Sequence, residues 1–350
     1  MTTLAWVIGR GGLLGSNVAR ALRGAASLTL WEPGAGPFPW SDRERLEARL
    51  AGAARDFVAT AANHQASRVF WCAGAGVVGT SPAELEAESW AWERLLAFLD
   101  SELSTTGHLH HLPMSLFLAS SAGGVYAGNT EGPLSETSPT RPLSPYGEAK
   151  LRQEQALARW AERHPEVSTI VARISNLYGP GQKAGKPQGL ISQMSRCLIH
   201  HRPVHLYVSL DTIRDYVFVE DAARALVSWM DRLSQEAARA RRGVRVLKVC
   251  ASERATTIAG LVGVFRRLAK RQLRIVSSLH PLRGQHPRRL EFRSTLWTDE
   301  PRPDATSLLV GIDRVYRHQL ALYRAGALPP PVSVLPEFRP EPEAPHPTLP

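Results

Sequence analysis

The chain has few cysteines and no long apolar run. Its three cysteines, Cys72, Cys197 and Cys250, are widely separated in 350 residues and show no metal-ligand spacing. We therefore expect neither a disulfide framework nor a metal site, and we expect a reducing, cytoplasmic location. No apolar stretch approaches the roughly 20 residues that a membrane-spanning helix needs. The apolar start, residues 4–8, runs directly into glycines, so we expect no signal peptide and no membrane partner.

Basic residues outnumber acidic ones by 42 to 32, which gives a net charge of +10. They concentrate between residues 239 and 248, 266 and 274, and 283 and 293. Nucleic-acid binding would use such clusters for phosphate contacts, but no recognisable nucleic-acid module or aromatic platform accompanies them. We expect a solvated basic surface, part of which could bind a nucleotide phosphate, and no nucleic-acid partner.

A glycine-rich turn follows the first apolar run. Gly9, Gly12 and Gly15 have the GxxGxxG spacing, which permits a tight turn, close approach to a pyrophosphate and close packing of the next helix. The N-terminus of that helix would face the phosphates. Glu32 ends the second expected strand, where it can accept hydrogen bonds from the adenosine ribose. This order of elements predicts dinucleotide binding.

The identity of the dinucleotide depends on two residues of opposite charge. Glu32 would repel a 2′-phosphate and so favours NAD. Arg10, inside the glycine turn, could instead bind that phosphate and favour NADP. NAD is the favoured cofactor, and NADP stays open as the alternative.

Short apolar runs alternate with helical stretches along most of the chain. The expected strands are 4–8, 28–31, 68–72, 115–119, 168–174 and 244–249, and the expected helices are 16–23, 82–100, 145–162, 189–201, 222–232 and 257–271. This alternation predicts an α/β fold with a doubly wound parallel (Rossmann) sheet. Ligands of such sheets bind beyond the carboxyl ends of the strands. Small-residue segments, including Ala73-Gly74 and residues 120–124, fall at those ends.

A tyrosine and a lysine stand one turn apart near the start of an expected helix. Ser144 suits the N-cap and Pro145 the first helical position. Tyr146 and Lys150 then share one face. Tyrosine titrates near about 10, and an ammonium one turn away favours the phenolate, which can accept a proton from a substrate hydroxyl. An amphipathic surface helix would show the same pair, so its meaning depends on the neighbouring motifs.

Together these segments resemble the extended short-chain dehydrogenase/reductase family, in its NAD-dependent epimerase/dehydratase group that acts on nucleotide sugars. The resemblance covers roughly residues 4–280. It is based on Gly9-x-x-Gly12-x-x-Gly15, Ser120-Ser121 with Val125-Tyr126, Tyr146-x-x-x-Lys150, Arg173 with Asn176-x-Tyr178-Gly179-Pro180, and Arg214-Asp215-Tyr216-Val217. Five such motifs in the right order are highly specific.

The resemblance implies a role for each matching residue. Tyr146 is the implied general base, and Lys150 would hold the cofactor ribose. The implied cofactor-binding residues are Gly9, Arg10, Gly12, Leu13, Leu14, Gly15, Glu32, Ala73, Gly74, Tyr146 and Lys150. A Ser or Thr of the family that bonds the same substrate hydroxyl would fall at Ala122 here. Ser121 is the nearest hydroxyl, and its catalytic and substrate-binding role is an expectation.

The loop after Ser121 separates the chemistries of the family. Its 4,6-dehydratases have an Asp-Glu pair where this chain has Gly123-Gly124, which cannot transfer a proton. The sequence therefore favours an epimerase or a one-way reductase over a dehydratase. A non-catalytic, dinucleotide-sensing member is the rival, because Ala122 lacks the hydroxyl. The presence of both Tyr146 and Lys150 argues against that rival.

In the family the substrate half includes Asn176 and Arg214. Arg214 would contact the diphosphate of a nucleotide sugar, for which a bidentate guanidinium is well suited; a salt bridge to Asp215 or Glu220 is the alternative. An arginine among residues 283–293 could be a second clamp. Residues 1–175, completed by about 211–250, would form the dinucleotide-binding domain, and 176–210 with 251–328 a smaller α/β substrate lobe.

Three further expectations concern the rest of the chain. The helix over 82–100 and the Tyr146 helix often pair across a homodimer in this family. Trp90 and Trp92 are expected to be packing residues rather than a ligand site, and could line that interface. The histidines His108, His110 and His111 lack a matching partner for a metal. Residues 329–350 contain nine of the 26 prolines and are expected to be disordered.

Overall fold

The computed structural model describes residues 2–34, 36–105, 113–183, 189–270, 273–277, 287–300 and 302–331. The three histidines at 108, 110 and 111, and most of the proline-rich segment 329–350, lie outside these ranges.

The predicted doubly wound parallel sheet is confirmed. Six parallel strands lie in the order β10-β5-β4-β3-β1-β2. Their bounds are β1 Thr3–Ile8, β2 Leu28–Trp31, β3 Ala66–Trp71, β4 Met114–Ser121, β5 Ser168–Ile174 and β10 Arg245–Cys250. The chain leaves β1 toward one edge for β2 and returns past it for β3, so a topological switch point lies at β1, where such sheets bind dinucleotides.

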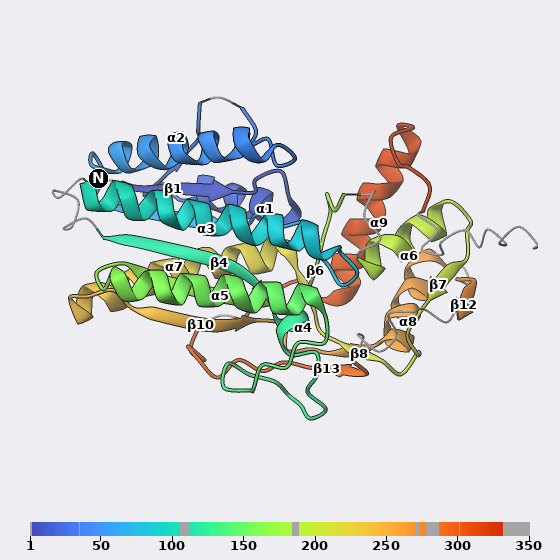
Figure 1. Ribbon diagram of the computed structural model, residues 1–350. Helices are drawn as coiled ribbons and strands as arrows, with labels where there is room; N and C mark the ends of the chain where they lie inside the picture. The colour runs from blue at the N-terminus through green and yellow to red at the C-terminus, as the bar shows by residue number, and fades with distance from the viewer. Residues whose placement is uncertain are drawn as a thin grey trace, which may run out of the picture.

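Helices cover both faces of the sheet. One layer contains α2 (Arg43–Ala61), α3 (Pro82–Thr105) and α5 (Pro145–Arg163), and the other contains α1 (Leu13–Arg23) and α7 (Val219–Ala240) (Figure 1). Successive strand residues point to opposite faces, so alternate residues of β1 enter different cores. Both faces are therefore apolar, as an all-parallel sheet requires.

A smaller lobe lies beyond the carboxyl ends of the strands (Figure 1). It contains α6 (Leu190–Ile199), α8 (Ile258–Ala269), α9 (Leu308–Arg324), and the short strands β7 (Val204–Leu206) and β12 (Ile275–Ser277). Further short strands are β6 (Asn176–Tyr178), β8 (Ile213–Arg214), β9 (Tyr216–Phe218), β11 (Thr256–Thr257) and β13 (Arg289–Leu290). Residues of α6, α8 and α9 share an apolar core separate from the two cores of the sheet.

Two helices differ from the sequence-based expectation. The sequence pattern predicts neither α2 nor α9. Each begins at a side-chain cap: Asp42 accepts a hydrogen bond from the Arg45 N–H at 3.0 Å, and Ser307 accepts one from the Val310 N–H at 3.4 Å. Such caps satisfy N–H groups that a helix start leaves free, so both starts are physically well determined.

One lysine of the expected basic surface is buried. Lys248, on β10, is 3% exposed. Its Nζ donates to the Ser294 hydroxyl at 2.8 Å and lies 4.9 Å from the ring centroid of Trp229. The cluster at 239–248 is therefore only partly a solvated surface.

In the described ranges, no helix is both long and apolar enough to cross a membrane.

Candidate functional site

The start of α5 fixes Tyr146 at the mouth of the sheet. The Ser144 hydroxyl caps the helix by accepting a hydrogen bond from the Gly147 N–H at 3.3 Å, and Pro145 occupies the first turn, as predicted. A Cβ at Gly147 would collide with the carbonyl oxygen of Gly124. Glycine at 147 therefore lets α5 approach α4 (Ala122–Val125), the single turn that follows β4.

The ring of Tyr146 lies between two glycines. A Cβ at Gly124 would lie 3.1 Å from Cε1 of the ring, and one at Gly76, in the loop after β3, would lie 3.4 Å from Cδ2. The ring therefore fills a slot between the loops that follow β3 and β4. This is the edge of the sheet where the sequence predicted the chemistry.

Lys150 is buried one turn along α5. It is 6% exposed, its Nζ donates to Oε1 of Gln153 at 3.0 Å, and this nitrogen lies 5.9 Å from the centroid of the Tyr146 ring. Burial lowers the pKa of the Lys150 ammonium, while the charges of Glu88 and Glu154 act in the opposite direction. Lys150 is thus desolvated, and the neighbouring carboxylates partly offset the resulting fall in its pKa.

Burial is also the largest influence on the pKa of Tyr146. It raises the pKa of the phenol above its ordinary value, and a side-chain hydrogen bond with Ser121 acts in the opposite direction. The sequence argument considered only the favourable effect of the ammonium. In the folded protein, desolvation of the phenolate is the larger effect.

Ser121, rather than Ala122, presents a hydroxyl to Tyr146. Ala122 begins α4 and is fully buried. Ser121 is the N-cap of the same turn, and its hydroxyl accepts a hydrogen bond from the Gly124 N–H at 3.1 Å. The turn after β4 therefore brings the hydroxyl of residue 121 to the phenol. Its catalytic role stays a prediction.

The glycine turn fits the backbone of a dinucleotide. Gly9 has a φ of +92°, and a Cβ there would lie 2.5 Å from the amide nitrogen of Ala73. A Cβ at Gly15 would collide with the carbonyl oxygen of Gly9. Gly12 is the N-cap of α1 without any side-chain cap, so the first N–H groups of α1 are not taken by a side chain. Leu13 and Leu14 form the first turn, where an anion binds favourably.

Glu32 is held by two arginines. Its Oε1 lies 2.7 Å from Nη1 of Arg10 and 3.2 Å from Nη2 of Arg23. The hydrogen bond from Arg10 holds the pKa of the Glu32 carboxyl below its ordinary value. Arg10 and Glu32, the two residues on which the choice between NAD and NADP depends, therefore form an ion pair at the end of β2.

Two of the predicted substrate residues, Asn176 and Arg214, make main-chain contacts. Asn176, on β6, donates from Nδ2 to the carbonyl of Asp215 at 2.7 Å. Arg214, on β8, is 9% exposed and donates to the carbonyls of Ile213 at 2.8 Å and Pro287 at 2.7 Å. Burial lowers the pKa of the Arg214 guanidinium. Its terminal nitrogens therefore contact carbonyls rather than the carboxylates that the alternative interpretation named.

Two arginines of the cluster from which a second diphosphate contact is expected have acidic partners. In the 283–293 cluster, Arg288 pairs with Asp211, and Arg289 lies 2.6 Å from Oε2 of Glu291. Both guanidiniums are exposed and paired with an acid. Any contribution of this cluster to a diphosphate site stays a prediction.

A buried ion pair fixes α5 to the sheet behind the site. Glu154, on α5, and Arg173, on β5, have side chains 8% and 6% exposed. Nη2 of Arg173 donates to Oε2 of Glu154 at 2.6 Å, and Nη1 donates to the hydroxyl of Tyr126 at 2.6 Å. The hydroxyl of Ser120 also donates to Glu154. The network thus joins α5, β4 and β5 one turn from Lys150.

Sequence reasoning missed Glu88. This half-buried residue of α3 accepts hydrogen bonds at Oε1 from the N–H groups of Ala75 and Gly76, the latter at 2.6 Å. In the sequence it is one of several acids on α3, and no pattern separates it from the exposed ones.

Across the described ranges, no group of three or more His, Cys, Asp or Glu is arranged for a metal ion.

Comparison with known proteins identifies related chains. The model of the NAD dependent epimerase/dehydratase family matches residues 5–240. The dTDP-glucose 4,6-dehydratase of Neisseria gonorrhoeae is 33% identical over 152 residues, which is 43% of this chain and 39% of that protein. The UDP-glucose 4-epimerase of Mycolicibacterium smegmatis is 32% identical over 108 residues, 31% of this chain and 34% of that protein. These matches therefore span about two fifths or less of the relatives' length.

Solved structures agree in fold over nearly the whole chain. UDP-glucose 4-epimerase from Thermotoga maritima, solved with UDP-glucose, has a TM-score of 0.69 at 20% identity and covers 93% of this chain and 99% of its own. The enzyme of that name from Thermus thermophilus, solved with NAD, has a TM-score of 0.68 at 20% identity, covering 91% and 98%. The expectation of NAD as the cofactor agrees with the family description and with the glycine turn. The protein belongs to the NAD-dependent epimerase/dehydratase family.

Proposed function

We propose that the protein is a sugar-nucleotide epimerase or a closely related NAD-dependent oxidoreductase. One observation supports this proposal above the others. The phenol of Tyr146, the ammonium of Lys150 and the hydroxyl of Ser121 gather at the carboxyl ends of β3 and β4, next to the contact of Gly9 with Ala73. A proton-transfer group and a dinucleotide turn at one edge of a parallel sheet suit hydride-transfer chemistry.

In this proposal each side chain has a defined role. Tyr146 takes a proton from a sugar hydroxyl at its own hydroxyl oxygen, and returns it when the carbonyl is reduced again. Lys150 holds the cofactor ribose and stabilises the phenolate. Ser121 orients the same hydroxyl. NAD, when bound, supplies the acceptor and donor of hydride.

The turn after β4 supports an epimerase or reductase over a dehydratase. Elimination of water needs a further acid and base at a neighbouring carbon. Gly123 and Gly124, which line this turn, have no side chain to transfer a proton, and Gly124 instead leaves room for the ring of Tyr146. A one-way reductase of a nucleotide sugar and a dinucleotide-sensing protein remain the alternatives.

We further propose that the sugar nucleotide lies between the sheet and the C-terminal lobe. Residues 1–175 and about 211–250 would then hold the cofactor, and 176–210 with 251–328 the substrate. Asn176 and Arg214 lie on β6 and β8, between the sheet and the lobe (Figure 1). On binding a diphosphate, Arg214 would exchange its hydrogen bonds to two carbonyls for hydrogen bonds to phosphate oxygens. The exchange is favourable because hydrogen bonds between charged groups are stronger than those to neutral carbonyls.

A panel of nucleotide sugars tests the proposed function. The purified protein is incubated with NAD and each sugar, and reduced nicotinamide and epimer formation are followed. Turnover on at least one sugar is the expected result. Saturable NAD binding without turnover on any sugar would instead support the sensor. Mass spectrometry of ligands that copurify with the protein would narrow the choice of sugar.

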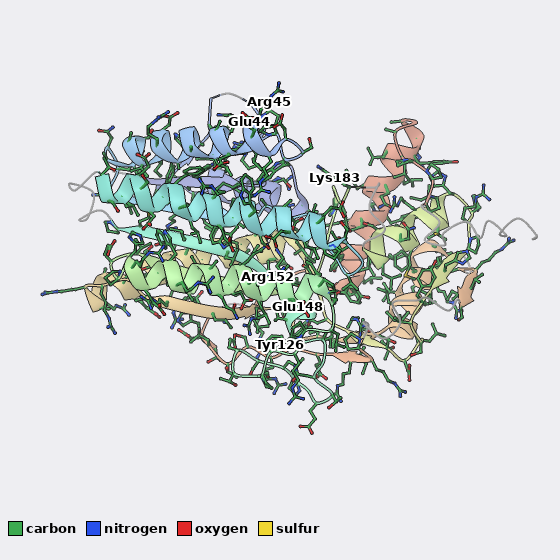
Figure 2. All side chains as sticks on the ribbon, in the orientation of Figure 1. Glu44, Arg45, Tyr126, Glu148, Arg152 and Lys183 are labelled. Atoms are coloured by element: carbon green, nitrogen blue, oxygen red, sulfur yellow. The ribbon has the colours of Figure 1, made fainter. Side chains whose placement is uncertain are left out.

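Replacing Glu32 by Gln should shift cofactor preference toward NADP. The change leaves Arg10 and Arg23 without their shared carboxylate, and a guanidinium that lacks an acid binds a 2′-phosphate well. We expect the ratio of the NADP to the NAD affinity to rise roughly tenfold or more. Calorimetric titration with both dinucleotides measures it. Glu44→Gln, the same charge change at an exposed position of α2 (Figure 2), is the control and should leave the ratio unchanged.

We propose a cytoplasmic homodimer that pairs through the outer faces of α3 and α5. Within the chain these helices already pack together: Nε1 of Trp92 donates to the carbonyl of Gln153 at 3.0 Å. Trp92 is thus a packing residue, as expected, and its own chain encloses it fully, so it cannot line an interface. Glu148 and Arg152 lie on the exposed side of α5 (Figure 2), where opposite charges of two copies could pair.

The mass of the protein in solution checks the dimer. Light scattering coupled to size exclusion should give twice the chain mass of 38.4 kDa. Arg152→Glu, which makes this part of α5 uniformly acidic, should shift the mass toward that of the monomer, because like charges would then face one another. A single-chain mass for the unaltered protein would contradict the proposed assembly.

A further inference from the structure

The loop after β3 holds a carboxylate beside the catalytic pair. Gly74, with a φ of +147°, and Gly76 leave space in this loop that any side chain would fill. A Cβ at Gly74 would lie 3.4 Å from Nζ of Lys150 and 3.5 Å from Oε2 of Glu88. A Cβ at Gly76 would lie 3.1 Å from the same carboxylate oxygen and 3.4 Å from Cδ2 of Tyr146. Each of the two glycine positions is therefore shared by the Glu88 carboxylate and one of its partners, Lys150 at Gly74 and Tyr146 at Gly76.

The two oxygens of Glu88 have different partners. Oε1 accepts hydrogen bonds from the N–H groups of Ala75 and Gly76, which ties this loop to α3. Oε2 is left facing the space over Gly74, toward Lys150. A carboxylate that accepts two hydrogen bonds from backbone N–H groups cannot rotate away without losing both. Its charge is therefore held in place.

We propose that Glu88 is a positioning residue of the active site, which ties the loop after β3 to α3 and places a negative charge beside Tyr146 and Lys150. Its effect on catalysis rests on the proposed function, because the pair must exchange protons for the charge to matter. The charge favours the protonated form of both partners. The pKa of the Tyr146 phenol is thereby raised, so the phenolate that takes the substrate proton is a stronger base.

The other groups around Tyr146 do not duplicate this charge. Ser121, at the end of β4, contributes a neutral hydroxyl, and α4 contributes glycines. On α5, Lys150 is the cation of the pair, and the carboxylate of Glu154 is bonded to the Arg173 guanidinium. Glu88 is accordingly the acidic group whose charge raises the pKa of Tyr146, in addition to the larger effect of burial.

The titration of Lys150 tests this inference without requiring turnover. The chain has only five lysines, so lysine labelled with carbon-13 at Cε yields few signals, and Lys150→Arg identifies the one of interest. Glu88→Gln keeps an oxygen that can accept the two loop N–H groups but removes the charge. We expect the titration midpoint of Lys150 to fall by about one pH unit in this variant. Glu86→Gln, on the exposed side of α3, should leave it unchanged.

A second readout separates the charge from the loop. With turnover, the low-pH limb of kcat should move to lower pH in Glu88→Gln, because Tyr146 loses its proton more readily. Glu88→Ala, which also removes the hydrogen bonds of the loop, should in addition weaken NAD binding. If Glu88 only held the loop, Gln would behave as the unaltered protein in both measurements, and the inference would be overturned. A shifted midpoint without turnover on any sugar would support the inference and reject the enzyme.

Discussion

Replacing Tyr146 by Phe is expected to lower kcat by about 10³-fold while leaving the affinity for NAD nearly unchanged. The phenol oxygen is the proposed acceptor of the substrate proton, and Phe cannot accept one. The ring itself stays between Gly76 and Gly124, because both neighbours contact ring carbons rather than the hydroxyl. The loss should therefore fall on kcat, with dinucleotide binding retained.

The measurement compares steady-state rates on the best sugar of the panel with calorimetric affinities for NAD. Tyr323→Phe is the matched control, since Tyr323 lies on α9 and is 45% exposed. It should retain full activity. A Tyr146→Phe variant with more than a tenth of the original rate would show that another group takes the proton. Ser121, which hydrogen-bonds the phenol, would then be the next residue to replace.

The candidate site could be predicted from the sequence because its signals are local, and its catalytic role stays a prediction. Ser144 and Pro145 define the start of α5 within four residues, and the helix period then fixes Lys150 on the face of Tyr146. The glycine spacing determines the turn between β1 and α1 in the same way. Strands β1, β3, β4 and β5 each contain at least three consecutive apolar residues, as a sheet buried on both faces requires. Propensity, pattern and tertiary packing all agree at these positions.

Tertiary contacts explain what the sequence could not predict. Glu88 stands among the acids of α3, and only the packing of the loop after β3 against that helix brings it to Lys150. The carbonyl partners of Arg214 come from neighbouring residue 213 and from residue 287, far along the chain. The raised pKa of Tyr146 follows mainly from burial, which a helical wheel does not measure. Helix α2 is a different case, because Asp42 and the residues after it offered a usable cap signal.

Breaking the ion pair behind the site should cost the most stability. Glu154→Leu leaves the Arg173 guanidinium, 6% exposed, without its carboxylate. Removal of one partner of a buried pair typically lowers the free energy of unfolding by about 3–5 kcal/mol, because the remaining charge is uncompensated. Urea denaturation measures the change. Glu162→Leu, at an exposed position of the same helix, should alter the free energy of unfolding by less than about 0.5 kcal/mol.

The double variant Glu154→Leu/Arg173→Met separates charge from packing. With both charges removed, no ion is left buried, so the double variant should be more stable than either single one. It should nevertheless lose activity, since Arg173 also donates to the Tyr126 hydroxyl, and Ser120, directly before Ser121, donates to Glu154. These bonds hold α5 against β4 and β5 one turn behind Lys150. Recovery of stability together with full activity would show that the network does not position the proposed catalytic pair, Tyr146 and Lys150.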